Sequence, residues 1–252
     1  MNYKIINFNK TEKSEEVQSS LNKMLKKAFF VNIDRDFIFN IGGDGSFLKV
    51  AKDYHNFDKK IIVNIPSGSL SFLESSSIED LSKVITNTYF YNNFQVLKVK
   101  INNIEYFSLN ELYIRSNYLH NFSLSINNTL FDNFYSSGLI FATIIGSSGV
   151  NRSNNGPLLL PNSKSIILST IEPLNNKFYK TFPNAIIFND NEKFQIKLND
   201  KVKKCILVID GDEEIILNKN DKIEIEVIES KANMLIDFST ESWIKRIREK
   251  LK

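Results

Sequence analysis

The feature that most constrains this chain is a group of three glycines around one aspartate, directly after an apolar run. Residues 40–48 read Asn-Ile-Gly-Gly-Asp-Gly-Ser-Phe-Leu and follow Phe37-Ile38-Phe39. The residues after the loop have apolar groups at helical spacing, with Ser46 as the expected N-cap. A strand, a glycine loop and a helix N-terminus in this order predict an anion-binding site. Asp-Gly between apolar segments is also a strong hairpin signal, so a simple turn stays open as the alternative.

The residue types in this loop are those that phosphate chemistry needs. Glycines let backbone N–H groups come close to a phosphate chain, because no side chain stands in the way. The carboxylate of Asp44 can hold a metal or accept the proton of a hydroxyl group. The loop by itself therefore indicates kinase-like chemistry.

The composition is that of a globular protein with a mild positive charge. The chain has 252 residues, of which 42% are hydrophobic and 24% charged, enough for one large core or two moderate ones. Its formal net charge is +3, and the lysines are spread along the chain. No nucleic-acid partner is therefore expected, whereas a substrate that carries a few phosphates fits this charge.

Cysteine and histidine are too few for several kinds of site. Cys205 is the only cysteine, and His55 and His120 are the only histidines. These counts exclude an intramolecular disulfide and a multi-cysteine zinc site, and they argue against a histidine-rich metal centre. No residue is assigned as a ligand of a resident metal. The sequence also has no apolar stretch of about 18 residues and no signal-peptide core, which predicts a cytoplasmic protein without a membrane partner.

The first third of the chain alternates between strand and helix patterns. Strands are expected at 3–8, 37–41 and 60–65, and helices at 17–28, where Ala28 is the last apolar residue, and at 78–85. This alternation predicts a parallel sheet with helices on its faces, in which ligands bind outside the carboxyl ends of the strands. The glycine loop follows one such end, and Pro-Ser-Gly-Ser at 66–69 follows another.

From about residue 94 the pattern changes to short strands without long helices between them. The expected strands are 96–101, 106–114, 122–126, 139–144, 165–171, 194–198, 206–209 and 222–227. Such a series predicts a mostly antiparallel β-sandwich. Asp210-Gly211-Asp212 is interpreted as a hairpin turn within it.

The chain ends in a predicted amphipathic helix, over about 239–252. Ser239 or Thr240 is its expected cap. The expected buried face consists of Trp243, Ile244 and Ile247. Basic residues, Arg246 among them, fall late in the helix, where they complement the helix dipole.

Two polar interruptions in the β-rich part are further candidate sites. Asn110-Glu111 lies inside an apolar run, where adjacent side chains point to opposite faces, so one of the two faces inward. A buried Asn or Glu needs partners, which a ligand with ring nitrogens and hydroxyls offers; an edge strand with both groups solvated is the alternative. Residues 146–157 form a long polar run between apolar strands, and such loops are more often functional than structural.

In their order and separation, these motifs resemble those of the NAD kinase family over nearly the whole chain. They are Gly-Gly-Asp-Gly-Ser, Ser-Gly-Ser-Leu-Ser-Phe-Leu, Leu-Asn-Glu-Leu, Ser-Gly-Leu and Gly-Ser-Ser-Gly-Val-Asn-Arg-Ser-Asn-Asn-Gly-Pro. The resemblance implies an α/β domain at 1–95, completed by 236–252, and a β-rich domain at 96–235. It also implies that a terminal phosphoryl group passes from ATP, or from polyphosphate, to the 2′-hydroxyl of the adenosine ribose of NAD, with Mg²⁺ as the divalent cation, and gives NADP.

Carried over position by position, the resemblance implies a role for each motif. Asp44 corresponds to the catalytic acid that helps to activate the 2′-hydroxyl, and Lys49 to a basic residue near the nucleotide. The loop that faces the phosphates comprises Gly42, Gly43, Gly45 and Ser46. Asn110 and Glu111 match the pair that contacts the adenosine part of NAD. The segment that wraps the dinucleotide comprises Ser148, Gly149, Val150, Asn151, Arg152 and Ser153.

Several positions depart from the family pattern, all in the expected dinucleotide site. Ser137 replaces an aspartate, so an acidic contact is missing, and Tyr135 stands where arginine is frequent. The other departures are Ile144 and Ile145 in place of Thr-Pro, Gly149 and Val150 in place of Ala-Tyr, Asn155 in place of a glycine and Glu172 in place of a small residue. Each lost contact costs on the order of 1 kcal/mol. Because the catalytic loop is intact, we expect an active kinase with altered NAD contacts.

Two functions of other kinds stay open. Lipid and sugar kinases with a Gly-Gly-Asp-Gly loop phosphorylate a different hydroxyl, although Asn110-Glu111 and the 146–157 run argue against them. A dinucleotide-binding protein without catalysis is the second alternative, because the loop around Val150 is altered. The resemblance further implies a homodimer or homotetramer, and it leaves the choice between NAD and NADH open.

Overall fold

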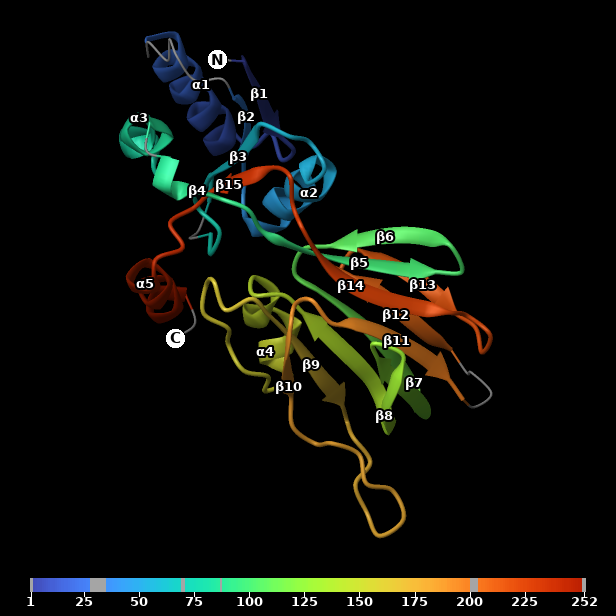
Figure 1. Cartoon of the computed structure of the whole chain (residues 1–252). Helices are drawn as coiled ribbons and strands as arrows, with labels where there is room; N and C mark the ends of the chain where they lie inside the picture. The colour runs from blue at the N-terminus through green and yellow to red at the C-terminus, as the bar shows by residue number, and fades with distance from the viewer. Residues whose placement is uncertain (1, 28–34, 69–70, 87, 200–203, 251–252) are drawn as a thin grey trace. The chain divides into compact units, whose positions relative to one another are not determined.

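A computed structural model describes residues 2–27, 35–68, 71–86, 88–199 and 204–250 of the chain (Figure 1). The chain folds as two compact units, one formed by Met1–Phe94 with Glu229–Lys252 and one by Gln95–Ile228. Three residues of the expected helix and of the second motif, Ala28, Ser69 and Leu70, lie outside the described residues.

The first unit contains a sheet in the strand order β1-β2-β3-β15-β4 (Figure 1). The strands are β1 (Asn2–Asn7), β2 (Asp36–Ile41), β3 (Lys60–Ile65), β4 (Tyr91–Asn92) and β15 (Asn233–Leu235). β1, β2, β3 and β15 run parallel, whereas β4 runs antiparallel to β15. The helices are α1 (Glu12–Lys27), α2 (Asp44–Tyr54), α3 (Ile78–Thr86), the short 3-10 helix η1 (Thr88–Phe90) and α5 (Thr240–Lys250). The predicted parallel sheet with flanking helices is confirmed.

Apolar residues on both faces of β2 and β3 explain why helices cover both sides of this sheet. One buried cluster joins α1 and α3 to the sheet and includes Leu21, Leu25, Phe37, Phe39, Ile61, Val63, Leu81 and Ile85. On the other side of the sheet, α2 (Figure 1) buries Phe47, Leu48, Val50 and Ala51. Each fully buried side chain of this kind contributes about 1.5–3 kcal/mol, so this packing fixes α2 directly after β2.

The second unit is an antiparallel sheet with the path β10-β9-β8-β7-β11-β14-β5-β6, to which β12 and β13 are added through β7. Its first strands are β5 (Gln95–Ile101), β6 (Ile104–Ser108), β7 (Glu111–Ile126), β8 (Thr129–Ala142) and β9 (Ser165–Ile171). The later strands are β10 (Ile186–Asn189), β11 (Lys193–Leu198), β12 (Cys205–Ile209), β13 (Glu213–Leu217) and β14 (Ile223–Glu229). Two short helices, η2 (Gly146–Ser148) and α4 (Val150–Ser153), follow β8.

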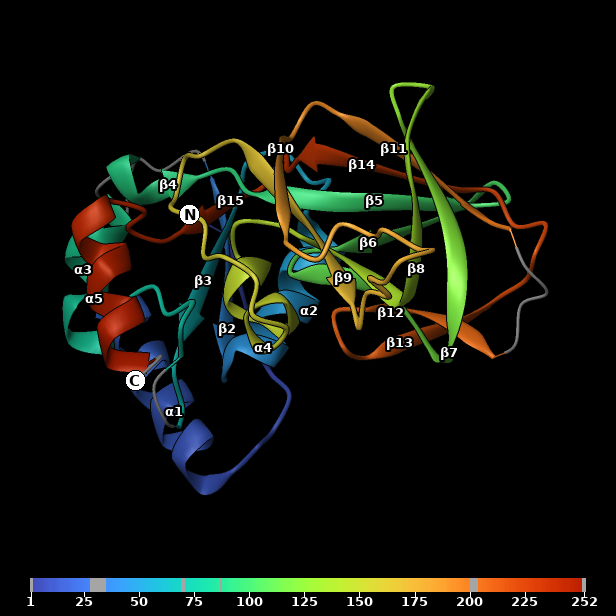
Figure 2. The ribbon, with the colours of Figure 1, turned by 90° about the horizontal axis from the view of Figure 1, so that it is seen from below.

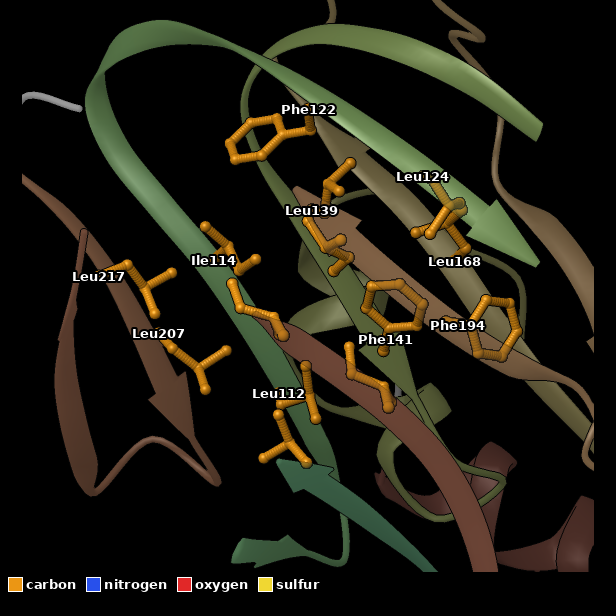
Figure 3. Close-up of a cluster of buried hydrophobic side chains, with 14 of the residues drawn as sticks. Leu112, Ile114, Phe122, Leu124, Leu139, Phe141, Leu168, Phe194, Leu207 and Leu217 are labelled. Carbon is orange, nitrogen blue, oxygen red and sulfur yellow. The ribbon is translucent and has the colours of Figure 1, made fainter. Parts of the chain in front are cut away.

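The long strand β7 changes partner along its length, which lets the sheet close over one core. Residues 112–116 of β7 pair with β12, and residues 122–126 pair with β11. The enclosed side chains come from both parts and include Leu112, Ile114, Phe122, Leu139, Phe141, Leu168, Phe194, Leu207 and Leu217 (Figure 3). This arrangement agrees with the predicted β-rich domain.

Three local expectations are wrong. The strand expected at 106–114 is interrupted, because β6 ends at Ser108 and β7 begins at Glu111. Ser46 is not the N-cap of α2, because the helix already begins at Asp44, after Gly43. On α5, Ile244 is 46% exposed, whereas Arg246 is only 9% exposed. Arg246 lies three residues after the buried Trp243, so the two side chains share one face of the helix.

Two other local expectations are confirmed. β12 and β13 pair antiparallel, so residues 210–212 form a hairpin turn. Ser239 accepts a hydrogen bond from the Ser242 N–H at 3.3 Å and therefore caps α5. Within the described ranges, none of the helices is long and apolar enough to cross a membrane.

Candidate active site

The glycine loop joins the carboxyl end of β2 to the first turn of α2. Gly42 is buried, and a Cβ atom at this position would lie 2.2 Å from Ser46 Oγ, so the close approach of the two residues requires glycine. A Cβ atom at Gly43 or Gly45 would meet nothing within 4 Å among the described residues. The N-terminal turn of α2 therefore has open space around it, as an anion site at a helix N-terminus needs.

The carboxylate of Asp44 is held by the segment that follows β3. It accepts hydrogen bonds from the Ser71 hydroxyl, from the Phe72 N–H at 2.8 Å and from the Leu73 N–H at 2.9 Å. We call these three donors the Asp44 clamp. Oδ1 takes two of them, whereas Oδ2 accepts only the Phe72 N–H among the described residues. Asp44 is half-buried, so one of its oxygens is fixed in place and able to accept a further donor.

Two buried asparagines support the Asp44 clamp. Asn40 of β2 and Asn64 of β3 are register partners with no exposed surface, and Asn40 Nδ2 donates to Asn64 Oδ1 at 2.8 Å. Asn64 Nδ2 donates in turn to Ser71 Oγ at 3.0 Å and to the Leu73 carbonyl at 3.2 Å. Sequence reasoning missed this pair, although an Asn near the end of each of two adjacent apolar strands is a visible signal.

Ser46 and Lys49, the other two candidates of this region, both lie on α2. Ser46 donates to the Gly43 carbonyl at 2.9 Å and accepts from Asn40 Nδ2 at 3.0 Å, so its hydroxyl stabilises the loop. Lys49 is exposed on α2, one turn further along the helix. The structure thus brings Gly42, Gly43, Asp44, Gly45 and Ser46 together within the first unit.

In the second unit, Asp210 holds the turn that carries Asn110. Its carboxylate accepts from the Ser108 hydroxyl at 2.7 Å, from the Leu109 N–H at 3.1 Å and from the Asn110 N–H at 2.9 Å. We call these three donors the Asp210 clamp. The turn at residues 210–212 is therefore more than a connection between two strands, and sequence reasoning missed this second role.

Next to the Asp210 clamp, two buried side-chain atoms have no hydrogen-bond partner among the described residues. They are Asn110 Oδ1 and Glu111 Oε2. Glu111 is only 4% exposed, and its pKa is raised to about 7, first by burial and then by the nearby charge of Asp210, against a smaller opposite effect of the Val150 N–H. Buried polar atoms are nearly always paired, so these two atoms are well placed to bind a ligand.

The segment 146–157 packs directly against this turn. A Cβ atom at Gly146 would lie 1.8 Å from the Asn110 carbonyl oxygen, and one at Gly149 would lie 2.5 Å from Glu111 Oε2. Gly146 therefore needs to be glycine, because a side chain there would meet backbone atoms, whereas a side chain at 149 would only displace the end of the Glu111 side chain. The glycine at 149, a departure from the family pattern, lies directly against the Glu111 carboxyl group.

Asn151 holds the segment 146–157 together from inside. It has no exposed surface, its Nδ2 donates to the Ser147 and Pro157 carbonyls, and its Oδ1 accepts from Ser169 at 2.8 Å. Its amide hydrogens are thus already used within the protein. Ser148 and Val150 are half-buried, whereas Arg152 and Ser153 are exposed, on or beside α4 at the end of β8 (Figure 2).

Several departures from the family pattern have a structural explanation. Ser137 stands where the family has an aspartate, and Glu172 where it has a small residue. The two side chains form a hydrogen bond, in which the Ser137 hydroxyl donates to Glu172 Oε2 at 2.8 Å. Asn155 has a φ of 59°, a conformation that glycine and asparagine adopt most readily. Tyr135 packs against Tyr179, with 4.3 Å between the two ring centroids.

The apolar departures belong to the packing of the same region. Ile145 is buried, and Ile144 and Val150 pack against a cluster formed by Ile140, Ala142, Leu159 and Ile167. Within the described part of the chain, no group of three or more His, Cys, Asp or Glu residues is arranged to hold a metal ion.

Comparisons with known proteins agree with this geometry. A family model described as the ATP-NAD kinase C-terminal domain matches residues 109–236. The chain is 35% identical to an NAD kinase of Ureaplasma parvum over 86% of this chain and 82% of that protein. It is 28% identical to an NAD kinase of Mycoplasmoides gallisepticum over 94% of this chain and 89% of that protein.

Solved structures share the fold. A yeast NADH kinase complexed with NADH superposes with a TM-score of 0.81 at 16% identity, covering 100% of this chain and 87% of that one. An NAD kinase from Archaeoglobus fulgidus in complex with ATP has a TM-score of 0.72 at 22% identity, covering 100% and 97%. The family model and the sequence relatives together show that the chain belongs to the NAD kinase family.

Proposed function

We propose that this protein transfers the terminal phosphoryl group of ATP to the 2′-hydroxyl of the adenosine ribose of NAD, giving NADP. The observation that carries the proposal is the Asp44 clamp, which fixes one carboxylate at the open N-terminus of α2. Phosphoryl transfer needs little covalent chemistry from the protein and depends on positioning and on the neutralisation of charge. A clamped acid beside a glycine loop meets the first need, and the helix N-terminus helps to meet the second.

In the first unit, Asp44 would orient the acceptor hydroxyl and take up its proton through Oδ2. The backbone N–H groups of Gly43, Gly45 and Ser46 would face the phosphates, with Lys49 as a nearby cation. The Gly42 N–H donates to the Ile65 carbonyl at 3.0 Å, so Gly42 shapes the loop and does not bind the phosphates. Mg²⁺ is commonly held by substrate phosphates and one or two carboxylates, so the single clamped carboxylate fits a cation that arrives with ATP. The ion, when bound, neutralises the charge that develops on the phosphoryl oxygens.

In the second unit, Asn110 and Glu111 would bind the adenosine part of NAD. Their two atoms without partners support this role, since a ligand hydroxyl or ring nitrogen would satisfy them. The Glu111 carboxyl group, with a pKa of about 7, can either donate or accept near neutral pH. Ser148, Gly149, Val150, Arg152 and Ser153 would line the dinucleotide, with Glu172 as the acid beside Ser137. Asn151, which has no exposed surface, would hold this segment in place from inside.

We further propose that the protein supplies NADP in the cytoplasm and assembles as a homodimer or homotetramer. Exposed aromatic side chains in the second unit support self-association: Phe131 is 39%, Phe182 50% and Phe178 84% exposed. Light scattering after gel filtration measures the oligomeric state directly. A monomer at micromolar concentration contradicts the assembly proposal.

The test of the activity is the formation of NADP by the purified protein from NAD, ATP and Mg²⁺. Parallel reactions contain NADH, a panel of lipid and sugar hydroxyl acceptors, and polyphosphate in place of ATP. Rapid turnover of another acceptor, without NADP formation, favours the related kinases. Binding of NAD without turnover with any donor favours the non-catalytic alternative.

A further inference from the structure

The last helix carries a buried cation that no part of the reaction has yet used. Arg246 is 9% exposed, whereas Lys245 and Arg248 on the same helix are exposed. A buried guanidinium group is unfavourable unless it is paired and hydrogen-bonded. The partners of Arg246 therefore explain why the buried face of α5 carries this arginine and not Ile244.

The hydrogen-bond partner of Arg246 is a backbone carbonyl in the segment that forms the Asp44 clamp. Arg246 Nη1 donates to the Phe72 carbonyl oxygen at 2.8 Å. That carbonyl and the Leu73 N–H belong to the same peptide group, which is planar with the two bonds pointing in opposite directions. The Leu73 N–H donates to Asp44 Oδ1 at 2.9 Å. One rigid peptide thus has the guanidinium on one side and the carboxylate on the other.

The negative charges that act on Arg246 include the carboxylate of Asp44 itself. Burial holds the pKa of Arg246 below its usual range, while the negative charges of Glu74, Asp237 and Asp44 act in the opposite direction. Polarisation by a cation strengthens the opposite N–H of a peptide as a donor. Arg246 therefore reinforces the hydrogen bond from Leu73 to Asp44 as well as fixing the orientation of the peptide.

Packing on the same helix holds the neighbouring side chain in place. The rings of Phe72 and Trp243 lie 4.8 Å apart at an interplanar angle of 76°, and Trp243 is 1% exposed. α5 thus fixes the clamp segment twice, through the Phe72 ring and through the Phe72 carbonyl. Asn64 supports the same segment from β3, at Ser71 Oγ and at the Leu73 carbonyl.

We propose that Arg246 is a positioning residue for phosphoryl transfer, which orients the Asp44 carboxylate through the peptide between Phe72 and Leu73. This inference rests on the proposed role of Asp44. It gives one residue of the final helix a part in holding the catalytic carboxylate, although Arg246 itself touches no reacting atom. Without Arg246, the carboxylate keeps its charge but loses its fixed orientation, so turnover falls while substrate binding changes little.

The test compares Arg246→Met and Arg246→Lys with Arg248→Met, which makes the same change at an exposed position of α5. We expect Arg246→Met to lower kcat by about 10- to 100-fold with KM for NAD and ATP within about threefold of wild type, since misplacement by about 1 Å has this effect. Arg246→Lys keeps the charge but not the planar fork, so we expect a loss of about threefold to tenfold. Arg248→Met should leave kcat unchanged.

A double-mutant cycle separates positioning from a merely structural role. In the Asp44→Asn background, Arg246→Lys should cause almost no further loss, because the group that it orients is gone. The same loss in both backgrounds overturns the proposal, as does wild-type kcat in Arg246→Lys.

If Arg246→Met does not fold, the cycle still gives a result, because Arg246→Lys keeps a positive charge beside the nearby acidic residues. Turnover by the wild-type protein decides the proposed function separately. If another acceptor proves to be the substrate, the same ratios are measured with that acceptor.

Discussion

The two units hold a carboxylate in the same way and use it differently. In each, an aspartate accepts hydrogen bonds from a serine hydroxyl and from the next two backbone N–H groups. The donors are Ser71, Phe72 and Leu73 for Asp44, and Ser108, Leu109 and Asn110 for Asp210. Such a clamp fixes a carboxylate because charge-assisted hydrogen bonds are short and strong.

What differs is the chemistry beside each clamp. Asp44 is half-buried at the open end of α2, so the clamp presents the acid itself. Asp210 instead orders a backbone turn, and the atoms without partners belong to its neighbours, Asn110 Oδ1 and Glu111 Oε2. One arrangement therefore serves a reactive group in the first unit and a binding surface in the second. The comparison predicts that the two clamps fail in different ways when they are broken.

The largest effect is expected for Asp44→Asn, which removes the acid from the first clamp. We expect kcat to fall by about 10²- to 10⁴-fold, because a carboxamide cannot take up the hydroxyl proton. Folding should be little changed, since the amide oxygen still accepts from the clamp. The measurement is the rate of NADP formation, with Asp53→Asn, an exposed position on α2, as the control. Near-normal turnover would remove Asp44 from the catalytic role.

Glu111, beside the second clamp, predicts that the stability of the protein depends on pH. The pKa of Glu111 is raised from 4.5 to about 7 in the folded protein, so between these values the folded state keeps a proton that the unfolded state releases. Stability should therefore fall as pH rises from about 4.5 to 7, by up to about 3 kcal/mol, and level off above 7.

Glu111→Gln cannot ionise, so it should remove this pH dependence and be more stable than wild type at pH 8. Denaturant unfolding at several pH values measures the difference, and Glu224→Gln, an exposed position on β14, is the control. If the free energies of unfolding of wild type and of Glu111→Gln change in the same way with pH, the raised pKa of Glu111 is contradicted.

A somewhat smaller effect is expected for Asp210→Asn, which breaks the second clamp. Loss of the charged acceptor should weaken NAD binding by about tenfold, because the turn that carries Asn110 loosens. Folding should be little changed, as for Asp44→Asn, since the amide oxygen still accepts hydrogen bonds. Calorimetric titration with NAD measures the affinity. Asp212→Asn changes an exposed acid of the same hairpin and serves as the control. Equal behaviour of the two variants would show that the clamp contributes nothing to binding.

The smallest effect concerns the hydrogen bond between Ser137 and Glu172. Ser137→Ala and Glu172→Ala should each destabilise the protein by about 0.5–1 kcal/mol and should not add when combined, since each removes the same bond. Unfolding of the two single variants and of the double variant measures this coupling. Fully additive changes would show that the two positions act independently.

Much of the fold follows from local sequence pattern, and the exceptions have a common cause. The strand at 60–65 and the helix at 78–85 were predicted nearly residue by residue, because their periodicity is set by neighbours in the chain. The break between Ser108 and Glu111 was not, because apolar residues on both sides of Asn110-Glu111 predicted one strand over 106–114. The turn forms there because Asp210, about a hundred residues later, supplies the acceptor for its N–H groups.

The sequence alone determined the alternation of strands and helices in the first third of the chain and the place of the glycine loop, which rest on contacts between residues close in the chain. It also identified Asp44, Asn110 and Glu111 as candidates, because polar residues in apolar surroundings are visible without a structure. Only the tertiary structure decided what surrounds them. The hydrogen bond from Arg246 to the Phe72 carbonyl spans 174 residues, and the hydrogen bond from the Asn110 N–H to Asp210 spans 100. No local pattern encodes such pairs, because they exist only after packing has brought distant segments together.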